Sequence, residues 1–390
     1  MKTVLTLFGT RPEVIKLAPV IRELEARPDR FRAINVTSAQ HTDLLYPLTS
    51  YFRIPLHHDL RVMEAGQSPA QVCARVLTSL EPILAREAPD LLLVQGDTTT
   101  AMAGALLGFF KQIPVGHVEA GLRSGNALSP FPEEMNRRLV TKLATLHFAA
   151  TSRNFRTLLG EGVPRPRVIL TGNPVVDSLN DVLAAPAPAP PRGLEAEKLR
   201  DRKLIVLTTH RRESFGEIMA GNLRVLRAFV DRHEDVVLAF PVHPNPSVRS
   251  VSNSILGGHP RIHLLDPLDY VAFVHLLARA WLIVSDSGGV QEEAPTLGKP
   301  LLVLRENTER PEAVDAGVAR LVGGNPETLA AILDELYPNH PWLQEVCEID
   351  NPFGHGDAGY RIVDAIGRFF GEGEASQEMG AQPEAKREIA

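Results

Sequence analysis

Short apolar runs alternate along the chain with longer segments in which apolar residues recur every three or four positions. The runs are typical of buried strands, and the longer segments are typical of amphipathic helices that cover a sheet. In the first half, strands are predicted at residues 4–8, 33–38, 91–94, 115–118, 146–149 and 168–171, with helices that include residues 69–86 and 98–110. This alternation favours a parallel sheet with helices on both faces.

The alternation restarts after a proline-rich stretch at residues 184–191. Proline lacks the backbone N–H that a helix interior or a central strand requires, so a connection between domains is predicted there or just after it. Further strands are predicted at residues 204–208, 236–240, 262–265, 282–285 and 301–304, and a last helix at about residues 357–370.

We therefore predict an α/β protein with two Rossmann-like, doubly wound domains. The first domain covers residues 1–175 and the second covers residues 176–356. The last helix is expected to pack back on the first domain, and the polar tail at residues 371–390 is expected to be disordered. Because open parallel sheets bind ligands at the carboxyl ends of their strands, the cleft between the domains is the expected active site.

Length and composition exclude several classes of protein. A chain of 390 residues is too long for one core, and 44% hydrophobic with 23% charged residues is ordinary for a globular protein. The net charge of −6 argues against a general nucleic-acid binder. Cys73 and Cys347 lie far apart, which indicates neither a disulfide framework nor a zinc site. Without a signal peptide or a membrane-spanning run, a cytoplasmic protein with no membrane partner is expected.

Residues 283–293 carry the most informative pattern. An apolar strand turns at residues 285–289, and a helix with Glu292 and Glu293 follows. A strand that breaks at paired glycines and restarts as a helix directs unpaired backbone N–H groups at one point, which favours an anion. A carboxylate about one turn later could accept hydrogen bonds from a ribose diol. The stretch is interpreted as a diphosphonucleoside site; the alternative is an ordinary turn in which glycine supplies a positive φ.

A second strand-to-helix turn lies at residues 9–13, Gly-Thr-Arg-Pro-Glu. Pro12 falls near the first helical position, where its missing N–H costs nothing. Arg11 and Lys16 then lie at a second helix start that favours an anion. The turn is not a GxGxxG motif, so no dinucleotide cofactor is predicted.

Several predicted strands end in polar residues that an apolar core does not need. Asp97 follows one strand, although it could simply cap the next helix. Glu119 follows another, and because glutamate is a poor capping residue a functional role is favoured. Glu133 and Glu134 lie at a predicted helix start, where the helix dipole could account for one of them. His210 follows a strand of the second half and can titrate near neutral pH.

Seven blocks of the sequence together resemble the non-hydrolysing UDP-N-acetylglucosamine 2-epimerases of bacteria. They occur in family order and span about residues 2–370. The blocks are residues 8–13 (FGTRPE), 96–100 (GDTTT), 116–123 (GHVEAGLR), 132–134 (PEE), 210–216 (HRRESFG), 286–293 (DSGGVQEE) and 308–313 (TERPEA). The resemblance implies a glycosyltransferase-B-like fold and a homodimer. It also implies an isomerase that interconverts UDP-N-acetylglucosamine and UDP-N-acetylmannosamine for envelope polysaccharides.

The implied reaction inverts C2 of an amido sugar, where no carbonyl acidifies the C2–H bond. Transient oxidation by NAD lacks its sequence fingerprint here. The remaining route expels UDP from C1, removes the C2 proton, and returns a proton to the other face of a glycal before UDP adds back. This route requires a firm hold on the diphosphate, acid and base groups on both faces of the ring, and a closed cleft.

The resemblance assigns roles by position, with no metal and no cofactor. It implies that Asp97, Glu119, Glu133 and His210 are catalytic, and it leaves open which carboxylate is the acid and which the base. The implied UDP ligands are Arg11, Lys16, Ser287, Gly288, Gly289, Glu293 and Arg310. An activating second UDP-N-acetylglucosamine site would use Gln40, His41, Gln67, Glu134, Arg211 and His243. Thr42, however, stands where relatives commonly have arginine, and threonine cannot contact phosphate as arginine does.

Other functions remain open at this level. A hydrolysing 2-epimerase would release free N-acetylmannosamine and UDP, and a UDP-sugar glycosyltransferase would use the same fold. A nucleotide-sugar-binding regulator without catalysis is disfavoured by the intact set of carboxylates. An enzyme acting on a 2,3-diacetamido uronic acid is a further alternative, because little in the sequence fixes the C3 and C6 substituents.

Overall fold

The structure is a computed structural model that describes residues 1–40, 42–64, 66–194, 199, 201–209 and 216–371. His41, His210 and Arg211 lie outside the described residues, as does nearly all of the predicted tail. Within the described part of the chain, no helix combines the length and the apolar character needed to cross a bilayer.

The first lobe is built on a parallel sheet with seven strands among the described residues, in the order β3-β2-β1-β4-β5-β6-β7. The strands are β1 (Lys2–Phe8), β2 (Phe31–Thr37), β3 (His58–Asp59), β4 (Leu91–Gln95), β5 (Val115–Ala120), β6 (Leu146–Ala149) and β7 (Val168–Leu170). The helices between them are α1 (Arg11–Glu25), α2 (Thr42–Tyr51), α3 (Pro69–Glu87), α4 (Thr99–Phe110), α5 (Glu133–Leu143) and α6 (Ser152–Gly160). The strand order reverses between β1 and β4.

The second lobe repeats this plan with six parallel strands among the described residues, in the order β10-β9-β8-β11-β12-β13. The strands are β8 (Lys203–Thr208), β9 (Val236–Pro241), β10 (Ile262–Leu265), β11 (Leu282–Ser285), β12 (Leu301–Val303) and β13 (Ala319–Leu321). The helices are α9 (Glu217–Arg232), α10 (Pro246–Leu256), α11 (Tyr270–Ala278), α12 (Gly288–Leu297), α13 (Pro311–Asp315), α14 (Pro326–Leu336) and α15 (Trp342–Glu345). Here the order reverses between β8 and β11.

Both faces of the first sheet are buried, which explains why its strands read as continuous apolar runs. Along β1, Val4 and Phe8 belong to one core cluster, whereas Leu5 and Leu7 belong to the cluster on the opposite face. This division follows from the two-residue period of a strand. The predicted α/β class with two doubly wound sheets is therefore confirmed.

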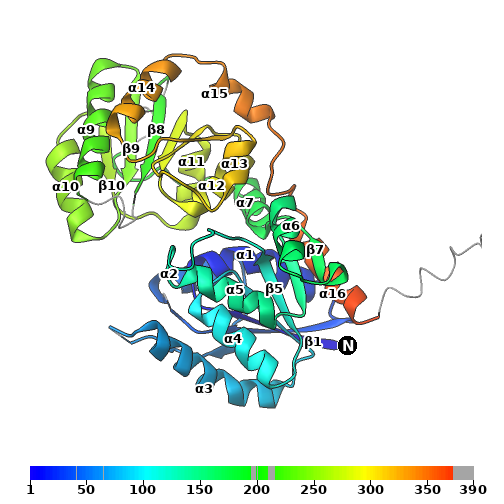
Figure 1. Cartoon of the computed structure of the whole chain (residues 1–390). Coiled ribbons are helices and arrows are strands. Elements are labelled where there is room, and N and C mark those ends of the chain that lie inside the picture. The colour runs from blue at the N-terminus through cyan, green and yellow to red at the C-terminus, as the bar shows by residue number, and fades with distance from the viewer. Residues whose placement is uncertain (41, 65, 195–198, 200, 210–215, 372–390) are drawn as a thin grey trace, which may run out of the picture.

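Two helices connect the lobes. α7 (Pro174–Ala184) contacts α1 of the first lobe and α11 and α12 of the second. α16 (Ala358–Phe369) returns from the second lobe and packs on α1 (Figure 1). The carboxylate of Asp177 in α7 fixes this return, because it accepts hydrogen bonds from the backbone N–H groups of Ala358 (3.2 Å) and Gly359 (2.8 Å). The domain boundary near residue 175 stays a prediction.

Most predicted strands agree with the observed strands to within two residues. Two strands were not predicted: β3 and β13, which contain two and three residues. Such short segments carry too few positions for a periodic pattern. Both are edge strands, so the centre of each sheet, where the candidate site lies, was predicted.

Candidate active site

The predicted site residues lie where each sheet reverses its strand order. Arg11 begins α1 directly after β1, and Asp97 follows β4. In the second lobe, Thr209 follows β8 and Ser287 follows β11. The carboxyl ends of parallel strands at such a switch point diverge and form the usual ligand site of doubly wound sheets. The topology therefore places each of the two predicted anion sites at the switch point of its sheet, after β1 in one lobe and after β11 in the other.

Glu119, the second-last residue of β5, has an unusual backbone conformation. Its φ is 65°, and the pairing of β5 with β6 shifts register between Val118 and Ala120. A positive φ costs free energy for a residue other than glycine, and such residues cluster at functional sites. A bulge also turns a side chain out of the regular alternation.

The carboxylate of Glu119 is buried but fully engaged. It accepts hydrogen bonds from Lys16 Nζ (2.5 Å), Gln95 Nε2 (2.5 Å) and Asn173 Nδ2 (3.3 Å). Burial alone would raise the pKa of Glu119, but the charges of Lys16 and Arg310 outweigh burial and lower that pKa. Burial would likewise lower the pKa of Lys16, but Glu119 and Glu292 raise it. Both members of the pair are therefore ionised at neutral pH.

Glu292 joins the two lobes. Its Oε2 lies 2.8 Å from Lys16 Nζ, and its Oε1 accepts a hydrogen bond from Arg310 Nε. We call Lys16, Glu119, Glu292 and Arg310 the buried charge cluster. Three of these side chains are buried and that of Arg310 is 14% exposed. Because burying charges carries a large desolvation cost, such a cluster is weak evidence for stability and better evidence for a functional site.

The start of α12 explains the paired glycines. The alternative that they supply a positive φ is wrong, because neither Gly288 nor Gly289 adopts one. A Cβ atom at Gly288 would instead lie 2.6 Å from Arg310 Nη1, so glycine makes room for the guanidinium at the helix start. The Ser287 side chain makes no capping hydrogen bond. A cation and the positive end of the helix dipole thus coincide, which suits an anion.

Glu293 points from the same helix into a buried environment. Burial raises the pKa of Glu293 to about 7; the charge of Arg11 opposes this shift and that of Glu292 adds to it. Near neutral pH this carboxyl group can therefore be either a hydrogen-bond donor or an acceptor. A ribose diol offers both kinds of partner.

Asp97 does not cap the following helix. That role belongs to Thr98, whose hydroxyl accepts a hydrogen bond from Ala101 N (3.0 Å). The Asp97 carboxylate is instead paired with Arg137, whose Nε lies 3.0 Å from Oδ2. Glu133 begins α5 and is half-buried, with no hydrogen bond or ion pair to its carboxylate among the described residues. Asp97 is therefore held in place, whereas Glu133 is not.

The six residues implied for an activator site are not joined by described contacts. Glu134 is buried, and its carboxylate accepts hydrogen bonds from Ser124 N (2.9 Å), Arg137 Nη1 (3.2 Å) and Arg138 Nε (2.8 Å). Gln67 bonds to its own loop, at Val62 O (3.0 Å) and Glu64 N (2.8 Å). Among the described residues, no hydrogen bond or ion pair links Gln40, Gln67 and Glu134 to one another. His41 and Arg211 lie outside the described residues, so the activator site stays a prediction.

Sequence reasoning missed the partners that orient the predicted groups. Arg137 holds Asp97, and Gln95 and Asn173 hold Glu119. Glu292 was noted for the ribose but instead binds the two cations. Arg137 lies one helical turn after Glu133, Gln95 is the last residue of β4, and Asn173 caps α7. Polar residues at these positions were the available signal.

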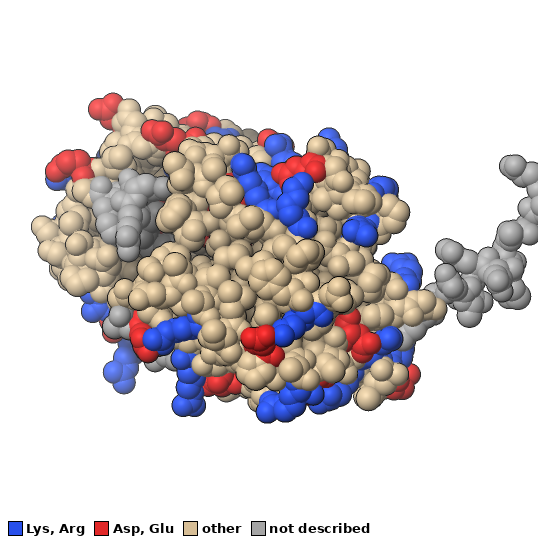
Figure 2. All heavy atoms as spheres, turned by 60° about the horizontal axis from the view of Figure 1, so that its bottom comes forward, with Lys and Arg blue, Asp and Glu red and all other residues tan. Residues whose placement is uncertain are grey.

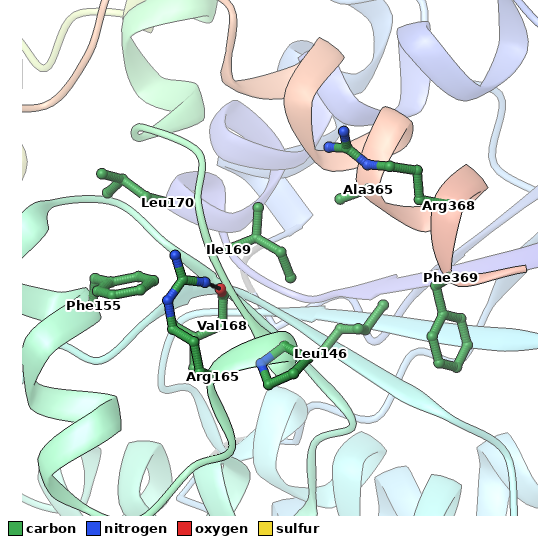
Figure 3. Close-up of a pocket in the computed structure, with 10 residues that line it drawn as sticks. Leu146, Phe155, Arg165, Val168, Ile169, Leu170, Ala365, Arg368 and Phe369 are labelled. Atoms are coloured by element: carbon green, nitrogen blue, oxygen red, sulfur yellow. Dashed lines mark hydrogen bonds between the residues drawn. The ribbon is translucent and has the colours of Figure 1, made fainter. Parts of the chain in front are cut away.

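A separate groove lies at the far edge of the first sheet (Figure 3). It has a volume of about 660 Å³ and is lined mainly by apolar residues of β6, β7 and α16, with Arg165 and Arg368 at its sides. It contains no carboxylate and none of the predicted site residues. Although a large pocket is the usual first hypothesis for a ligand site, the predicted carboxylates Asp97, Glu119 and Glu133 lie elsewhere in the first lobe.

Comparison with known proteins is consistent with this site. A family model described as UDP-N-acetylglucosamine 2-epimerase matches residues 22–367. The UDP-N-acetylglucosamine 2-epimerase of Escherichia coli K12 is 43% identical over 375 residues, which cover 93% of this chain and 98% of that protein.

Solved structures agree over nearly the whole chain. The Staphylococcus aureus MnaA co-structure with UDP is 41% identical, with a TM-score of 0.88 over 95% of this chain and 97% of that chain. UDP-GlcNAc 2-epimerase from Neisseria meningitidis bound to UDP-GlcNAc is 39% identical, with a TM-score of 0.86 over 94% of this chain and 100% of that chain.

The fold extends beyond epimerases. A glycosyltransferase of kitacinnamycin, only 16% identical, superposes with a TM-score of 0.65 over 94% of this chain and 98% of that chain. This likeness concerns the fold alone and confirms the predicted glycosyltransferase-B-like architecture. Because the family model covers most of the chain and relatives above 40% identity match more than nine-tenths of it, the chain belongs to the UDP-N-acetylglucosamine 2-epimerase family, whose members are isomerases.

Proposed function

We propose that this protein interconverts UDP-N-acetylglucosamine and UDP-N-acetylmannosamine without net hydrolysis. In the proposed reaction, the C2 proton passes to a protein group and the C1–O bond to UDP breaks, which leaves a glycal and UDP in the site. A proton then returns to C2 from the other face of the ring, and UDP adds back at C1. The UDP and UDP-GlcNAc bound by the S. aureus and N. meningitidis relatives support this choice of substrate.

The observation that carries the proposal is the buried charge cluster. It places the ionised carboxylate of Glu119 beside Lys16, and it brings Arg310 from the other lobe within the same group of contacts. A leaving diphosphate needs cations and open backbone N–H groups, and the start of α12 beside Arg310 offers both. A C2 proton needs a carboxylate nearby, which the end of β5 supplies.

Asp97 and Glu133 are assigned as the other acid and base groups. Asp97 lies at the end of β4, next to β5 in the sheet, and Arg137 keeps its orientation. Glu133 starts α5 without a competing ion pair in the described structure. Arg11, Ser287, Gly288, Gly289 and Glu293 are assigned to UDP, and His210, outside the described residues, is assigned to the leaving group.

Closure of the lobes supports retention of the intermediate. Besides the Lys16–Glu292 pair, Thr151 donates a hydrogen bond to Glu312 Oε1 (2.6 Å) and Arg153 pairs with Asp315 (2.6 Å) across the lobes. A closed site excludes the water that would capture a glycal or an oxocarbenium ion. The predicted role in the synthesis of envelope polysaccharide precursors is part of this proposal.

We also propose that the protein is a homodimer. Phe109 and Phe110 of α4 are 59% and 63% exposed, and Met135 and Leu139 of the neighbouring α5 are exposed as well. Figure 2, which turns the bottom of Figure 1 toward the reader, shows a broad central stretch with few charged side chains. Large exposed apolar patches mark interfaces. Sedimentation equilibrium is expected to give twice the mass of one chain, and the mass of a single chain would contradict this.

A proton NMR time course tests the function. The enzyme is incubated with UDP-N-acetylglucosamine alone, and signals of UDP-N-acetylmannosamine are expected to rise to a constant ratio while all sugar stays bound to UDP. Free N-acetylmannosamine without UDP-N-acetylmannosamine would instead identify a hydrolysing epimerase. No change in the absence of an acceptor would favour a glycosyltransferase.

A further inference from the structure

Glu13 is buried in the first lobe without an assigned role. It is the third residue of α1 and only 1% exposed. Its Oε2 accepts hydrogen bonds from Gly9 N (3.0 Å), Thr10 N (2.8 Å) and Thr10 Oγ1 (2.8 Å). Its Oε1 accepts one from Thr98 Oγ1 (2.8 Å). One carboxylate therefore bonds to both loops at the switch point, the one after β1 and the one after β4.

Helix capping explains only half of this arrangement. The bonds to Gly9 and Thr10 are those of a capping residue at the third helical position. At the start of α3 the exposed Gln71 does the same for Ser68 N (2.8 Å) with a neutral side chain. Capping thus requires neither burial nor charge. A buried carboxylate is costly, and burial raises the pKa of Glu13 to about 7 even though its hydrogen bonds oppose the shift. The bond to Thr98 is the feature that capping leaves unexplained.

The Thr98 hydroxyl is fixed on both sides. It donates to Glu13 and accepts from Ala101 N (3.0 Å). The preceding residues are also held, because Asn136 Nδ2 donates to Asp97 O (2.9 Å) and His117 Nε2 bonds to Gly96 O (2.8 Å). Three consecutive residues of this loop are therefore anchored by α1, α5 and β5.

We propose that Glu13 is a positioning residue for the epimerisation, tying the loop after β1 to Asp97 through the Thr98 hydroxyl. The hydrogen bond from Thr98 to Glu13 fixes the distance between two groups. One is the pair of cations on α1, Arg11 and Lys16, and the other is the Asp97 carboxylate after β4. Glu13 does not touch the reacting atoms. This inference rests on the proposed function, because it takes Asp97 as a catalytic group.

Two variants cut the tie from opposite ends. Thr98→Val keeps the shape of residue 98 but removes the donor to Glu13 together with the acceptor for Ala101 N, and Glu13→Ala removes the acceptor for Thr98. Since a displacement of about 1 Å can cost about 100-fold in rate, each variant is expected to lose about 100-fold in kcat. For Thr98→Val the KM is expected to change little, because Thr98 is not among the proposed UDP ligands.

Conservative variants and a cap control separate positioning from folding. Thr98→Ser keeps the hydroxyl. Glu13→Gln keeps the span, because its carbonyl can accept from Thr10 while its amide donates to Thr98. Both are expected to stay within about tenfold of wild-type kcat. Asn325→Ala removes the exposed cap of α14, whose side chain accepts from Glu327 N (2.9 Å), and is expected to leave kcat unchanged.

The double variant Glu13→Ala/Thr98→Val decides the question. If the two side chains act through one bond, its kcat is no lower than that of the worse single variant. If wild type is active and the two kcat losses multiply to about 10⁴-fold in the double variant, the positioning role of Glu13 is wrong. The same holds if Thr98→Ser is as slow as Thr98→Val. Neither result would contradict the proposed function. If the wild-type protein does not epimerise its substrate, the proposed function is wrong. The positioning role of Glu13 then fails as well, because Asp97 would not be a catalytic group.

Discussion

The starts of α1 and α12 both lie at the point where their sheet reverses its strand order, after β1 and β11, but are used differently. At α1, the backbone N–H groups of Gly9 and Thr10 are taken by the Glu13 carboxylate of the same helix. At α12, Ser287 provides no cap, and the Arg310 guanidinium lies beside Gly288. A carboxylate already bound at a helix start competes with a phosphate there, whereas a start with a neighbouring cation and no side-chain cap attracts one.

This difference indicates that the two lobes have different roles in the proposed reaction. The sequence pattern predicts an anion site at both starts, but the structure favours α12 for the diphosphate. The contribution of α1 comes from side chains instead: Lys16 belongs to the buried charge cluster, and Arg11 carries charge at the helix start. On this account the first lobe performs the proton transfers and the second lobe holds the leaving group.

The largest expected effect comes from changing the first lobe at Glu119. Glu119→Gln removes the ionised carboxylate, so kcat is expected to fall by about 10²- to 10⁴-fold, whereas UDP binding at α12 is retained. Steady-state kinetics and calorimetric titration with UDP measure the two properties. Glu335→Gln, which removes one carboxylate from the exposed pair with Arg320, is the matched control. Wild-type turnover in Glu119→Gln would remove this residue from the mechanism.

The second prediction concerns Glu293, the buried carboxyl group of α12. Its pKa of about 7 in the folded protein exceeds the ordinary value of 4.5, so the folded state binds the proton more tightly than the unfolded state. Wild-type stability from this group therefore falls as pH rises from about 4.5 to about 7. Glu293→Gln does not lose this stability. Its free energy of unfolding relative to wild type should therefore rise by up to about 3 kcal/mol between about pH 4.5 and about pH 7.

Urea unfolding of both proteins at pH 5 and pH 8 measures this gain. The comparison uses the difference between variant and wild type at each pH, so other titrating groups cancel. Parallel pH dependence in the two proteins would show that Glu293 does not carry a raised pKa.

The third prediction concerns Glu292, which neutralises Lys16 and Arg310 in the unliganded protein. A diphosphate must compete with this carboxylate for the same cations. Glu292→Gln is therefore expected to bind UDP more tightly, by roughly tenfold or ~1.4 kcal/mol. Calorimetric titration measures the change. Weaker binding would mean that Glu292 helps to hold the nucleotide rather than competing with it.

The smallest effect is expected at Ser287. Because its side chain makes no capping bond, Ser287→Ala should change the unliganded protein's free energy of unfolding by less than about 0.5 kcal/mol. Loss of a working cap, as in Asn325→Ala, costs about 1 kcal/mol. UDP should then stabilise Ser287→Ala less than wild type if the hydroxyl binds phosphate. Equal destabilisation of the two unliganded variants would show that α12 is capped after all.

The alternating pattern was enough to predict the fold and the ends of the strands on which Asp97, Glu119 and Ser287 lie. It could not predict partners that depend on the packing of distant segments. Glu292 lies one residue from Glu293 in the same helix, yet the two side chains have different surroundings. Likewise, Gly288 reads as a turn residue, and only the approach of Arg310 shows why glycine is required.

The most direct test of the account follows the C2 proton. Wild-type enzyme is incubated with UDP-N-acetylglucosamine in deuterated water, without an acceptor, and both sugar nucleotides are analysed by NMR and mass spectrometry. The account predicts one deuterium per molecule, at C2 only, with the sugar still attached to UDP. Epimerisation without deuterium at C2, or accumulation of free sugar in place of UDP-N-acetylmannosamine, would contradict it.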